Sequence, residues 1–354
     1  MRSLLAHTPE ELRAAFTADG LPAFRAAQVA RWLFVRRVRD FAAMANLPRE
    51  LRAQLAVEWD SRALERVAVH EAADGTRKLV LGTRDGARLE AVLIPEARRQ
   101  TLCVSSQIGC SLDCSFCATG RMGLGRNLRA EEIVDQVMHA CEILDAAGQR
   151  LSHVVFMGMG EPLLNLKSVV QAIRVLTHAE AFALSPKRIT VSTAGVVPKL
   201  AELGAALPVR LAVSLHATTD ALRDELVPLN KRFPLAELLD ACAKYPLAPR
   251  DRLSFEYALL DGVNDTDADA RRLARIALDL RAKLNLIPMN EHPSSPYRRP
   301  PEARIDAFLA VLAGAGVSAT VRRSRGDDIY AACGQLGALA TAQGPATSGD
   351  AAIR

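Results

Sequence analysis

The sequence has no run of about 20 apolar residues, so it predicts no membrane-spanning helix. Its first residues, MRSLLAHTPEELRAAF, also lack the apolar stretch and the cleavage site of a secretory signal. They instead predict a helix with a capping box, because Thr8, Pro9 and Glu11 have the spacing that such a box needs. We therefore expect a cytosolic protein whose 354 residues, 49% of them hydrophobic, form one large and one smaller domain.

Cysteine and lysine are both scarce. The seven cysteines are an odd number, which argues against a disulfide framework and for metal binding or catalysis. Cys141 and Cys242 lie in helical patterns and are expected to fill the core. Only seven of the 45 basic residues are lysine, and an arginine-rich chain with a net charge of +5 is compatible with an RNA partner.

The chain has a helical first part and a later part in which strands and helices alternate. Residues 1–65 have helical patterns, and residues 76–95 alternate around Asp85-Gly86 as a β-hairpin does. Seven later apolar segments predict strands separated by helices: 102–106, 153–159, 188–193, 209–216, 253–260, 284–289 and 318–323. This alternation predicts an α/β fold with parallel strands, as a barrel or an open sheet, and a disordered tail at 341–354.

The helical segment 23–41 combines apolar residues with arginines. Its apolar stripe consists of Phe24, Val29, Trp32, Leu33 and Val35, and the interleaved basic residues are Arg31, Arg36, Arg37 and Arg39. These arginines form either an ordinary solvated face or a surface that contacts the phosphates of a nucleic acid.

Small polar residues end several of the predicted parallel strands. Four strands end in this way, in Gly160 and Glu161, in Ser192 and Thr193, in Ser214 and His216, and in Asn290. One polar strand end is ordinary loop chemistry, but four together are typical of the ligand-binding rim of a parallel barrel.

The stretch QIGCSLDCSFCATG places Cys110, Cys114 and Cys117 together without a fourth cysteine. Structural zinc needs four protein ligands, so zinc would require a distant residue such as His153 or His216. A 4Fe–4S cluster suits the trio better, because three thiolates hold three irons and leave the fourth iron open. The spacing C-x3-C-x2-C is the motif of the radical S-adenosylmethionine (radical SAM) superfamily, which this chain therefore resembles.

That resemblance implies a partial (β/α)6 barrel of the TIM type, a 4Fe–4S cluster and bound S-adenosylmethionine (SAM). In such enzymes the segment GMGEP holds the SAM ammonium, which implies this function for Gly160 and Glu161. The positions that line the rest of SAM are matched by Ser192, Ser214, Leu215, His216 and Asn290. For each of these residues the alternative is a role in the core or in a loop cap. For His216 in particular the alternative is a structural histidine.

Two further cysteines narrow the resemblance to one family within this superfamily. Cys103 precedes the trio, and Cys333 lies in RGDDIYAACGQL near the C-terminus. Together with MGMGEP, VSLHA and VPLNKRFP, these segments closely resemble the dual-specificity adenine-C2 RNA methyltransferases of the RlmN type, over residues 21–336. The segments 243–257 and 288–301 depart from the family pattern, which puts the expected RNA contacts in question more than the chemistry.

The resemblance implies a radical mechanism that uses two SAM molecules in each turnover. Cys333 takes a methyl group from the first SAM, and after cleavage of the second SAM the methyl carbon of Cys333 becomes a radical that adds to adenine C2. Glu90 is the implied acceptor of the C2 proton, and strand alternation places it on one face with the apolar residues Val92 and Ile94. Cys103 then releases the product by forming a transient disulfide with Cys333, which a reductant resets.

The implied substrates are an adenosine in the peptidyl-transferase region of 23S rRNA and the adenosine 3′ of the anticodon in some tRNAs. A flavodoxin or ferredoxin system would supply electrons. The expected domains are a helical, RNA-contacting accessory domain with the hairpin at 1–95 and the radical SAM core at 96–340. Two alternatives remain open: the sister activity on adenine C8, which the RGDD form at 325–328 disfavours, and a noncatalytic zinc or Fe–S RNA-binding protein.

Overall fold

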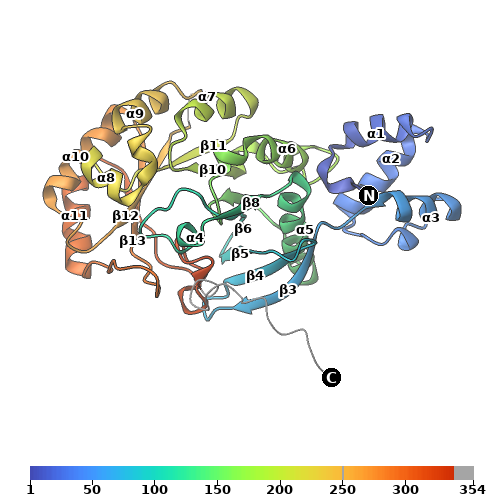
Figure 1. The fold of residues 1–354 in the computed structure, drawn as a ribbon, viewed down its shortest axis with the longest axis horizontal. Coiled ribbons are helices and arrows are strands. Elements are labelled where there is room, and N and C mark those ends of the chain that lie inside the picture. The colour runs from blue at the N-terminus through green and yellow to red at the C-terminus, as the bar shows by residue number, and fades with distance from the viewer. Residues whose placement is uncertain (249–250, 339–354) are drawn as a thin grey trace.

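The computed structural model describes residues 1–248 and 251–338, and the tail predicted at 341–354 lies outside them (Figure 1). The chain begins with a helical lobe that contains β1 (Arg2–Ser3), α1 (Pro9–Ala18), α2 (Ala23–Ala30), α3 (Arg49–Glu58) and β2 (Trp59–Asp60). The predicted capping box is confirmed, because the side chains of Thr8 and Glu11 each accept a hydrogen bond from the other residue's amide. No helix in the described part of the chain is long and apolar enough to cross a membrane.

Within the described residues, one ten-stranded sheet forms the centre of the larger part, in the order β14-β13-β12-β11-β10-β9-β6-β5-β4-β3. The strands β6 and β9 to β14 are parallel: β6 (Arg99–Cys103), β9 (His153–Phe156), β10 (Ile189–Thr193), β11 (Arg210–Ser214), β12 (Ser254–Leu259), β13 (Lys283–Pro288) and β14 (Ala319–Val321). All of them lie within the predicted segments or overlap them. The expected parallel α/β fold is therefore confirmed.

Helices follow the first six parallel strands: α5 (Ala130–Ala146), α6 (Leu166–Thr177), α7 (Val197–Ala206), α8 (Asp220–Leu226) with α9 (Leu235–Ala243), α10 (Asp267–Asp279) and α11 (Glu302–Gly314). The parallel strands thus form six β/α units of an open, partial barrel, because β14 and β3 lie at opposite edges of the sheet. Cys141 on α5 and Cys242 on α9 are buried, as predicted for core cysteines.

Three antiparallel strands extend the sheet beyond β6. They are β3 (Leu64–Glu71), β4 (Arg77–Thr83) and β5 (Arg88–Glu96), and β5 pairs with β6. The predicted hairpin around Asp85-Gly86 is confirmed as β4 and β5, and it is continuous with the main sheet. The sequence did not reveal β3, because this edge strand is exposed along nearly its whole length and lacks the apolar alternation of a half-buried strand.

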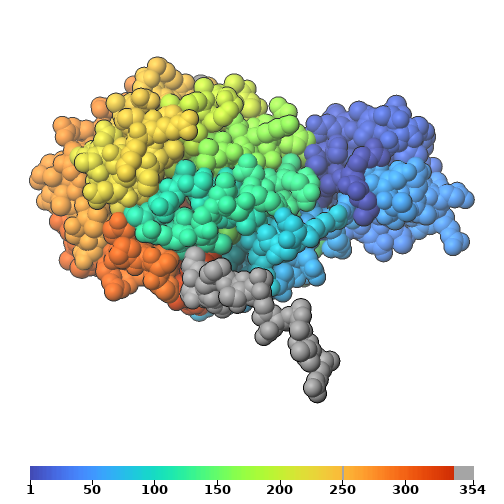
Figure 2. Space-filling model, in the orientation of Figure 1, coloured from blue at the N-terminus to red at the C-terminus, as the bar shows by residue number. Residues whose placement is uncertain are grey.

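A buried ion pair joins the helical lobe to the barrel. Arg39 pairs with Asp135 on α5, and both side chains are at most 1% exposed. The other carboxylate oxygen of Asp135 accepts the backbone amides of Ala63 and Leu64, at 2.6 and 2.8 Å. The expectation that Arg39 lies on a solvated or phosphate-contacting face is therefore wrong. Figure 2 shows the lobe, in dark blue, packed against one end of the larger part.

Candidate active site

The loops that follow the parallel strands meet at one edge of the sheet. Glu161, just after β9, accepts the amide of Leu163 at 2.9 Å and the amide of Ala194, which follows β10, at 2.8 Å. Glu161 is only 3% exposed, and burial raises the pKa of its carboxyl to about 7. A buried carboxylate at the rim is chemically suited to an ammonium group.

The loop before Glu161 requires a glycine at position 160. Its φ is +93°, and a Cβ atom would lie 2.4 Å from the Cβ of Gln107. The side-chain oxygen of Gln107 in turn accepts the Glu161 amide at 2.8 Å. This close approach fixes the backbone of Glu161 against the strand β7 (Gln107–Gly109), which leads into the cysteine loop.

Arg223 connects three loops of the rim, although the sequence analysis did not identify it. Its guanidinium is fully buried and donates to the carbonyl oxygens of Leu215 at 3.0 Å and Ala194 at 2.6 Å. It also donates to the side-chain oxygen of Asn230 at 3.0 Å, in the segment VPLNKRFP. Burial lowers the pKa of Arg223 to about 10, so it stays a cation near neutral pH.

The remaining predicted rim residues lie on these same loops. Ser192 is buried on β10, Ser214 ends β11, and Leu215 is fully buried. His216 has a left-handed backbone with φ +59°, and its Nδ1 accepts the amide of Ala258 at 2.9 Å. Burial lowers the pKa of His216 to about 3, so the imidazole is neutral and Nε2 carries its proton. These contacts support the structural alternative for His216.

The predicted iron ligands lie on the loop between β7 and α4 (Ala118–Arg121). Burial raises the pKa of Cys110 to about 12 and that of Cys114 well above its usual value, and the nearby Cys117 thiol raises both further. The loop is tightly held, because a Cβ atom at Gly109 would lie 1.9 Å from the carbonyl oxygen of Gly123, which directly precedes β8 (Leu124–Asn127), the partner strand of β7. Neighbouring buried thiols become thiolates when a metal centre supplies positive charge.

These residues suit an iron–sulfur cluster. In residues 1–248 and 251–338, no three His, Cys, Asp or Glu side chains converge as ligands of a single metal ion. A cubane requires a different arrangement, since each thiolate binds a different iron atom. The histidines considered for zinc do not complete a site with the trio: His153 begins β9, at the end of the strand away from the rim, and Nδ1 of His216 already accepts a hydrogen bond.

The C-terminal segment that carries Cys333 packs on the cysteine loop. The amide of Ala118 donates to the carbonyl oxygen of Gly334, and the hydroxyl of Thr119 donates to that of Leu336, both at 2.8 Å. The side-chain amide of Asn290 donates to the Cys333 carbonyl oxygen at 2.9 Å. Asn290 therefore contacts the Cys333 segment from the rim.

Cys333 is near enough to Cys103 and to Cys117 for the charges of these thiols to act on one another. Burial and the neighbouring Cys333 thiol raise the pKa of Cys103 above its usual value. Burial also raises the pKa of Cys333, and the charges of Glu256 and Cys117 add to this shift while Arg322 opposes it. Cys333 is nevertheless exposed to solvent. Glu256, buried on β12, escaped the sequence analysis because it lies inside an otherwise apolar strand.

Glu90 lies on the same face of the sheet as Cys103. Val92 pairs with both Lys78 on β4 and Cys103 on β6, so these three residues form one row across the sheet, and Glu90 is two residues from Val92. Besides the apolar residues expected on this face, Glu90 has charged and polar neighbours. Its Oε1 lies 3.4 Å from Nζ of Lys78, and its Oε2 accepts the amide of Gly337 at 2.9 Å.

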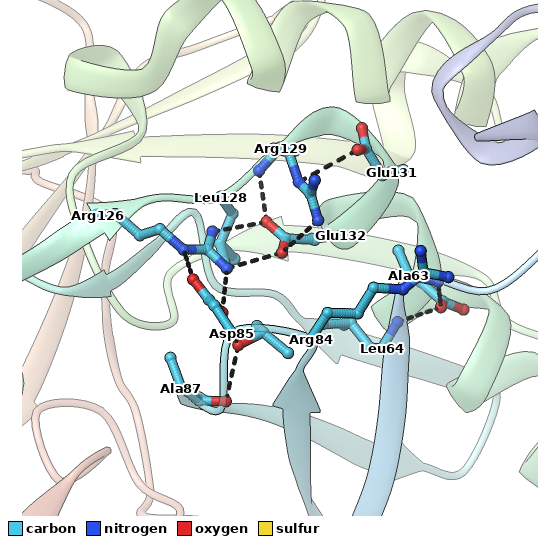
Figure 3. Close-up of polar contacts among 12 residues, drawn as sticks. Ala63, Leu64, Arg84, Asp85, Ala87, Arg126, Leu128, Arg129, Glu131 and Glu132 are labelled. Carbon is cyan, nitrogen blue, oxygen red and sulfur yellow. Dashed lines mark hydrogen bonds and ion pairs between the residues drawn. The ribbon is translucent and has the colours of Figure 1, made fainter. Parts of the chain in front are cut away.

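A polar network joins the hairpin turn to β8 and to the first turn of α5, as Figure 3 shows. Arg126, on β8 (Leu124–Asn127), donates from Nε to Asp85 at 2.7 Å and from Nη1 to Glu132 at 2.9 Å. Asp85 occupies the hairpin turn, and Glu132 is fully buried in the first turn of α5. The Arg126 guanidinium holds the pKa of Asp85 well below its usual range. The hairpin that carries Glu90 and Lys78 is thereby fixed to β8, the partner of the strand that leads into the cysteine loop.

The arginines of the helical lobe have different surroundings. Arg31 and Arg36 are exposed, and the Arg36 guanidinium lies 4.3 Å from the centre of the Trp32 ring. Phe24 and Val35, which belong to the predicted apolar stripe, are 56% and 57% exposed. The lobe thus presents cations beside exposed apolar groups.

Comparisons with known proteins identify the family. The family model "Radical SAM superfamily" matches residues 104–274, and "Ribosomal RNA large subunit methyltransferase N-terminal domain" matches residues 3–59. The chain is 50% identical over 319 residues to the dual-specificity RNA methyltransferase RlmN of Syntrophobacter fumaroxidans, covering 90% of this chain and 92% of that protein. It is 47% identical to the protein of the same name from Jannaschia sp., covering 94% and 89%.

A solved structure agrees with these relatives. The crystal structure of a radical SAM methyltransferase from Sphaerobacter thermophilus superposes with a TM-score of 0.92 at 46% identity, covering 96% of this chain and all of that one. The match includes the helical lobe as well as the partial barrel, since it extends over nearly the whole chain. The chain therefore belongs to the radical SAM superfamily and, within it, to the RlmN family of dual-specificity RNA methyltransferases.

Proposed function

We propose that this chain methylates C2 of adenosine in 23S rRNA and tRNA through a methylated Cys333. The observation that supports this most strongly is that Glu90 and Cys103 share one face of the sheet, where Glu90 accepts the amide of Gly337 from the segment that carries Cys333. Adenine C2 lies between two ring nitrogens and is electron-poor, so ordinary transfer of the electrophilic SAM methyl to it is unfavourable. A carbon radical on a methylated thiol is the chemically reasonable alternative.

Cys110, Cys114 and Cys117 would hold three irons of a 4Fe–4S cluster. When bound, the cluster supplies the electron that cleaves SAM to methionine and a 5′-deoxyadenosyl radical. The buried Glu161 would accept the SAM ammonium beside Gly160. The remaining SAM-lining residues are proposed to be Ser192, Ser214, Leu215, His216 and Asn290, and the bond from Asn290 to the Cys333 carbonyl would link this site to the acceptor thiol.

The thiols and the carboxylate then have separate tasks. Cys333 takes a methyl group from one SAM by displacement, which suits a thiolate. After a second SAM supplies the radical that removes a hydrogen from this methyl group, its carbon adds to adenine C2. Glu90 accepts the C2 proton, and the adduct returns its unpaired electron to the electron-transfer system. Cys103 attacks the sulfur of Cys333, which releases methyladenine and leaves a disulfide for an external reductant, in keeping with a reducing cytosol.

RNA would contact both parts of the protein. The accessory domain, at 1–95, presents the exposed cations Arg31 and Arg36, and the core, at 96–340, carries the accessible thiol of Cys333. A base inside an RNA stack cannot reach this thiol, so the target adenosine must be extruded or lie in a single-stranded loop. A flavodoxin or ferredoxin system is the proposed electron donor.

Mass analysis of RNA nucleosides from a deletion strain tests this function. We expect 2-methyladenosine to disappear from both 23S rRNA and tRNA, and to return when the gene is restored. Loss of 8-methyladenosine instead would establish the C8 activity, and unchanged nucleosides would refute both. Anaerobic reconstitution separates the enzyme from a noncatalytic module, because the enzyme binds about four irons per chain and cleaves SAM, whereas a zinc or Fe–S module cleaves no SAM.

A further inference from the structure

The antiparallel strands β3, β4 and β5 hold the C-terminal segment that carries Cys333. In Figure 1 this segment, coloured red, runs beside these strands. At the turn between β3 and β4, the amide of Ala73 donates to the Asp328 carboxylate at 3.0 Å, and Asp74 accepts the amide of Gly326 at 3.3 Å. The turn therefore holds the RGDD sequence that precedes the thiol.

The backbone before Cys333 is strained. Gly326 has φ +64°, and a Cβ atom there would lie 2.9 Å from side-chain atoms of Thr76 and Ala331. Tyr330 has φ +52°, a left-handed conformation that is unfavourable for a non-glycine residue. Such a conformation persists only when surrounding contacts hold it in place.

Lys78 on β4 supplies one of these contacts. It is 1% exposed, and its Nζ lies 3.4 Å from the carbonyl oxygen of Tyr330 and 3.4 Å from Oε1 of Glu90. The second oxygen of Glu90 accepts the amide of Gly337 at 2.9 Å. The Lys78–Glu90 pair therefore contacts the chain on both sides of Cys333, three residues before it and four residues after it.

Burial makes this pair unlike a surface salt bridge. A buried ammonium needs partners, and removing one member of a buried pair leaves the other charge without compensation. The neighbouring Arg77 provides the contrast, because it pairs with Glu71 at 2.9 Å on the opposite face of β4, where the two side chains are 31% and 56% exposed. Lys78 therefore faces the Cys333 segment, whereas the adjacent Arg77 lies on the opposite face of the strand.

We propose that Lys78 is a positioning residue, which fixes the Cys333 segment and the carboxylate of Glu90 relative to each other. This inference depends on the proposed function, in which Cys333 donates the carbon and Glu90 accepts the proton. Neither iron ligation nor SAM cleavage uses these contacts. Loss of Lys78 therefore uncouples SAM cleavage from RNA methylation, and the two processes do not fail together.

The test compares Lys78→Met with Arg77→Met in reconstituted, full-length enzyme. The measured quantity is the amount of 5′-deoxyadenosine formed for each methylated adenosine in a tRNA transcript. A misfolded fraction makes neither product, so general instability leaves this ratio unchanged. We expect the ratio to rise about 100-fold in Lys78→Met, the loss that follows a misplacement of about 1 Å, and to stay at the wild-type value in Arg77→Met.

A wild-type ratio in Lys78→Met would overturn the inference, as would an equal rise in Arg77→Met. If Lys78→Met does not accumulate, Asp74→Ala in the solvent-accessible turn provides the comparison. The ratio should rise there too, and an unchanged ratio would overturn the inference in that case. Wild-type protein that cleaves SAM but methylates no adenosine would instead refute the proposed function.

Discussion

Replacement of Cys103 by alanine separates the two proposed thiol functions. Three steps use no atom of Cys103: the methylation of Cys333, the removal of a hydrogen from the new methyl group, and the addition of its carbon to adenine. Only product release requires Cys103. We therefore expect Cys103→Ala protein to accumulate as a covalent adduct, with RNA attached through the sulfur of Cys333. At most one RNA attaches to each chain, because each chain has a single Cys333 and cannot release its product.

The structure indicates that this substitution leaves the fold intact. Cys103 pairs through its backbone with Val92 and Val155, and these bonds do not depend on its side chain. Loss of one buried sulfur costs about 1 kcal/mol, which lowers Tm by roughly 2–4 °C or less in a chain of this size. Cys242→Ala removes the same group from the buried face of α9, so it is a matched control for stability.

The assay is a denaturing gel of protein purified from cells. Cys103→Ala should give a slower band that collapses on ribonuclease treatment, and peptide mass analysis should find the nucleotide remnant on Cys333. Cys242→Ala and the double variant Cys103→Ala, Cys333→Ala should lack the band. If Cys103→Ala turns over normally without an adduct, Cys103 is an ordinary buried strand residue and the two-thiol reasoning is refuted.

Three further outcomes are expected. Cys114→Ala should lose the brown chromophore and all SAM cleavage, and an intact cluster in this variant would show that the ligand assignment is wrong. The double variant Arg31→Glu, Arg36→Glu should weaken RNA binding and reduce the slope of log affinity against log salt concentration by roughly 0.7–0.9 for each lost phosphate contact. An unchanged slope would show that these arginines form a solvated face and contact no phosphate. Because burial raises the pKa of Cys103, single-turnover product release should accelerate about tenfold per pH unit between about pH 7 and 9. A flat profile would mean that Cys103 ionisation does not limit release.

Local patterns in the sequence were sufficient for the parallel strands and the hairpin, and they led to the prediction of an iron–sulfur cluster on the cysteine loop. The capping box at Thr8 and the turn at Asp85-Gly86 depend on residues only a few positions apart, so their geometry follows from spacing. The alternation of apolar strands with helices likewise predicted the parallel sheet. The spacing of Cys110, Cys114 and Cys117 indicated a cluster, because one short loop carries all three thiols.

Tertiary structure alone decided which groups surround those residues. Alternation placed Glu90 on a face but could not show that Lys78 lies beside it, or that both hold the Cys333 segment. Arg39 has the spacing of an exposed arginine, yet it is buried against Asp135, which is 96 positions away in the chain. Periodicity assigns a side chain to one face of its own element, whereas its charge environment comes from whichever distant element packs there. For Lys78 that element is the turn at Tyr330, 252 positions away.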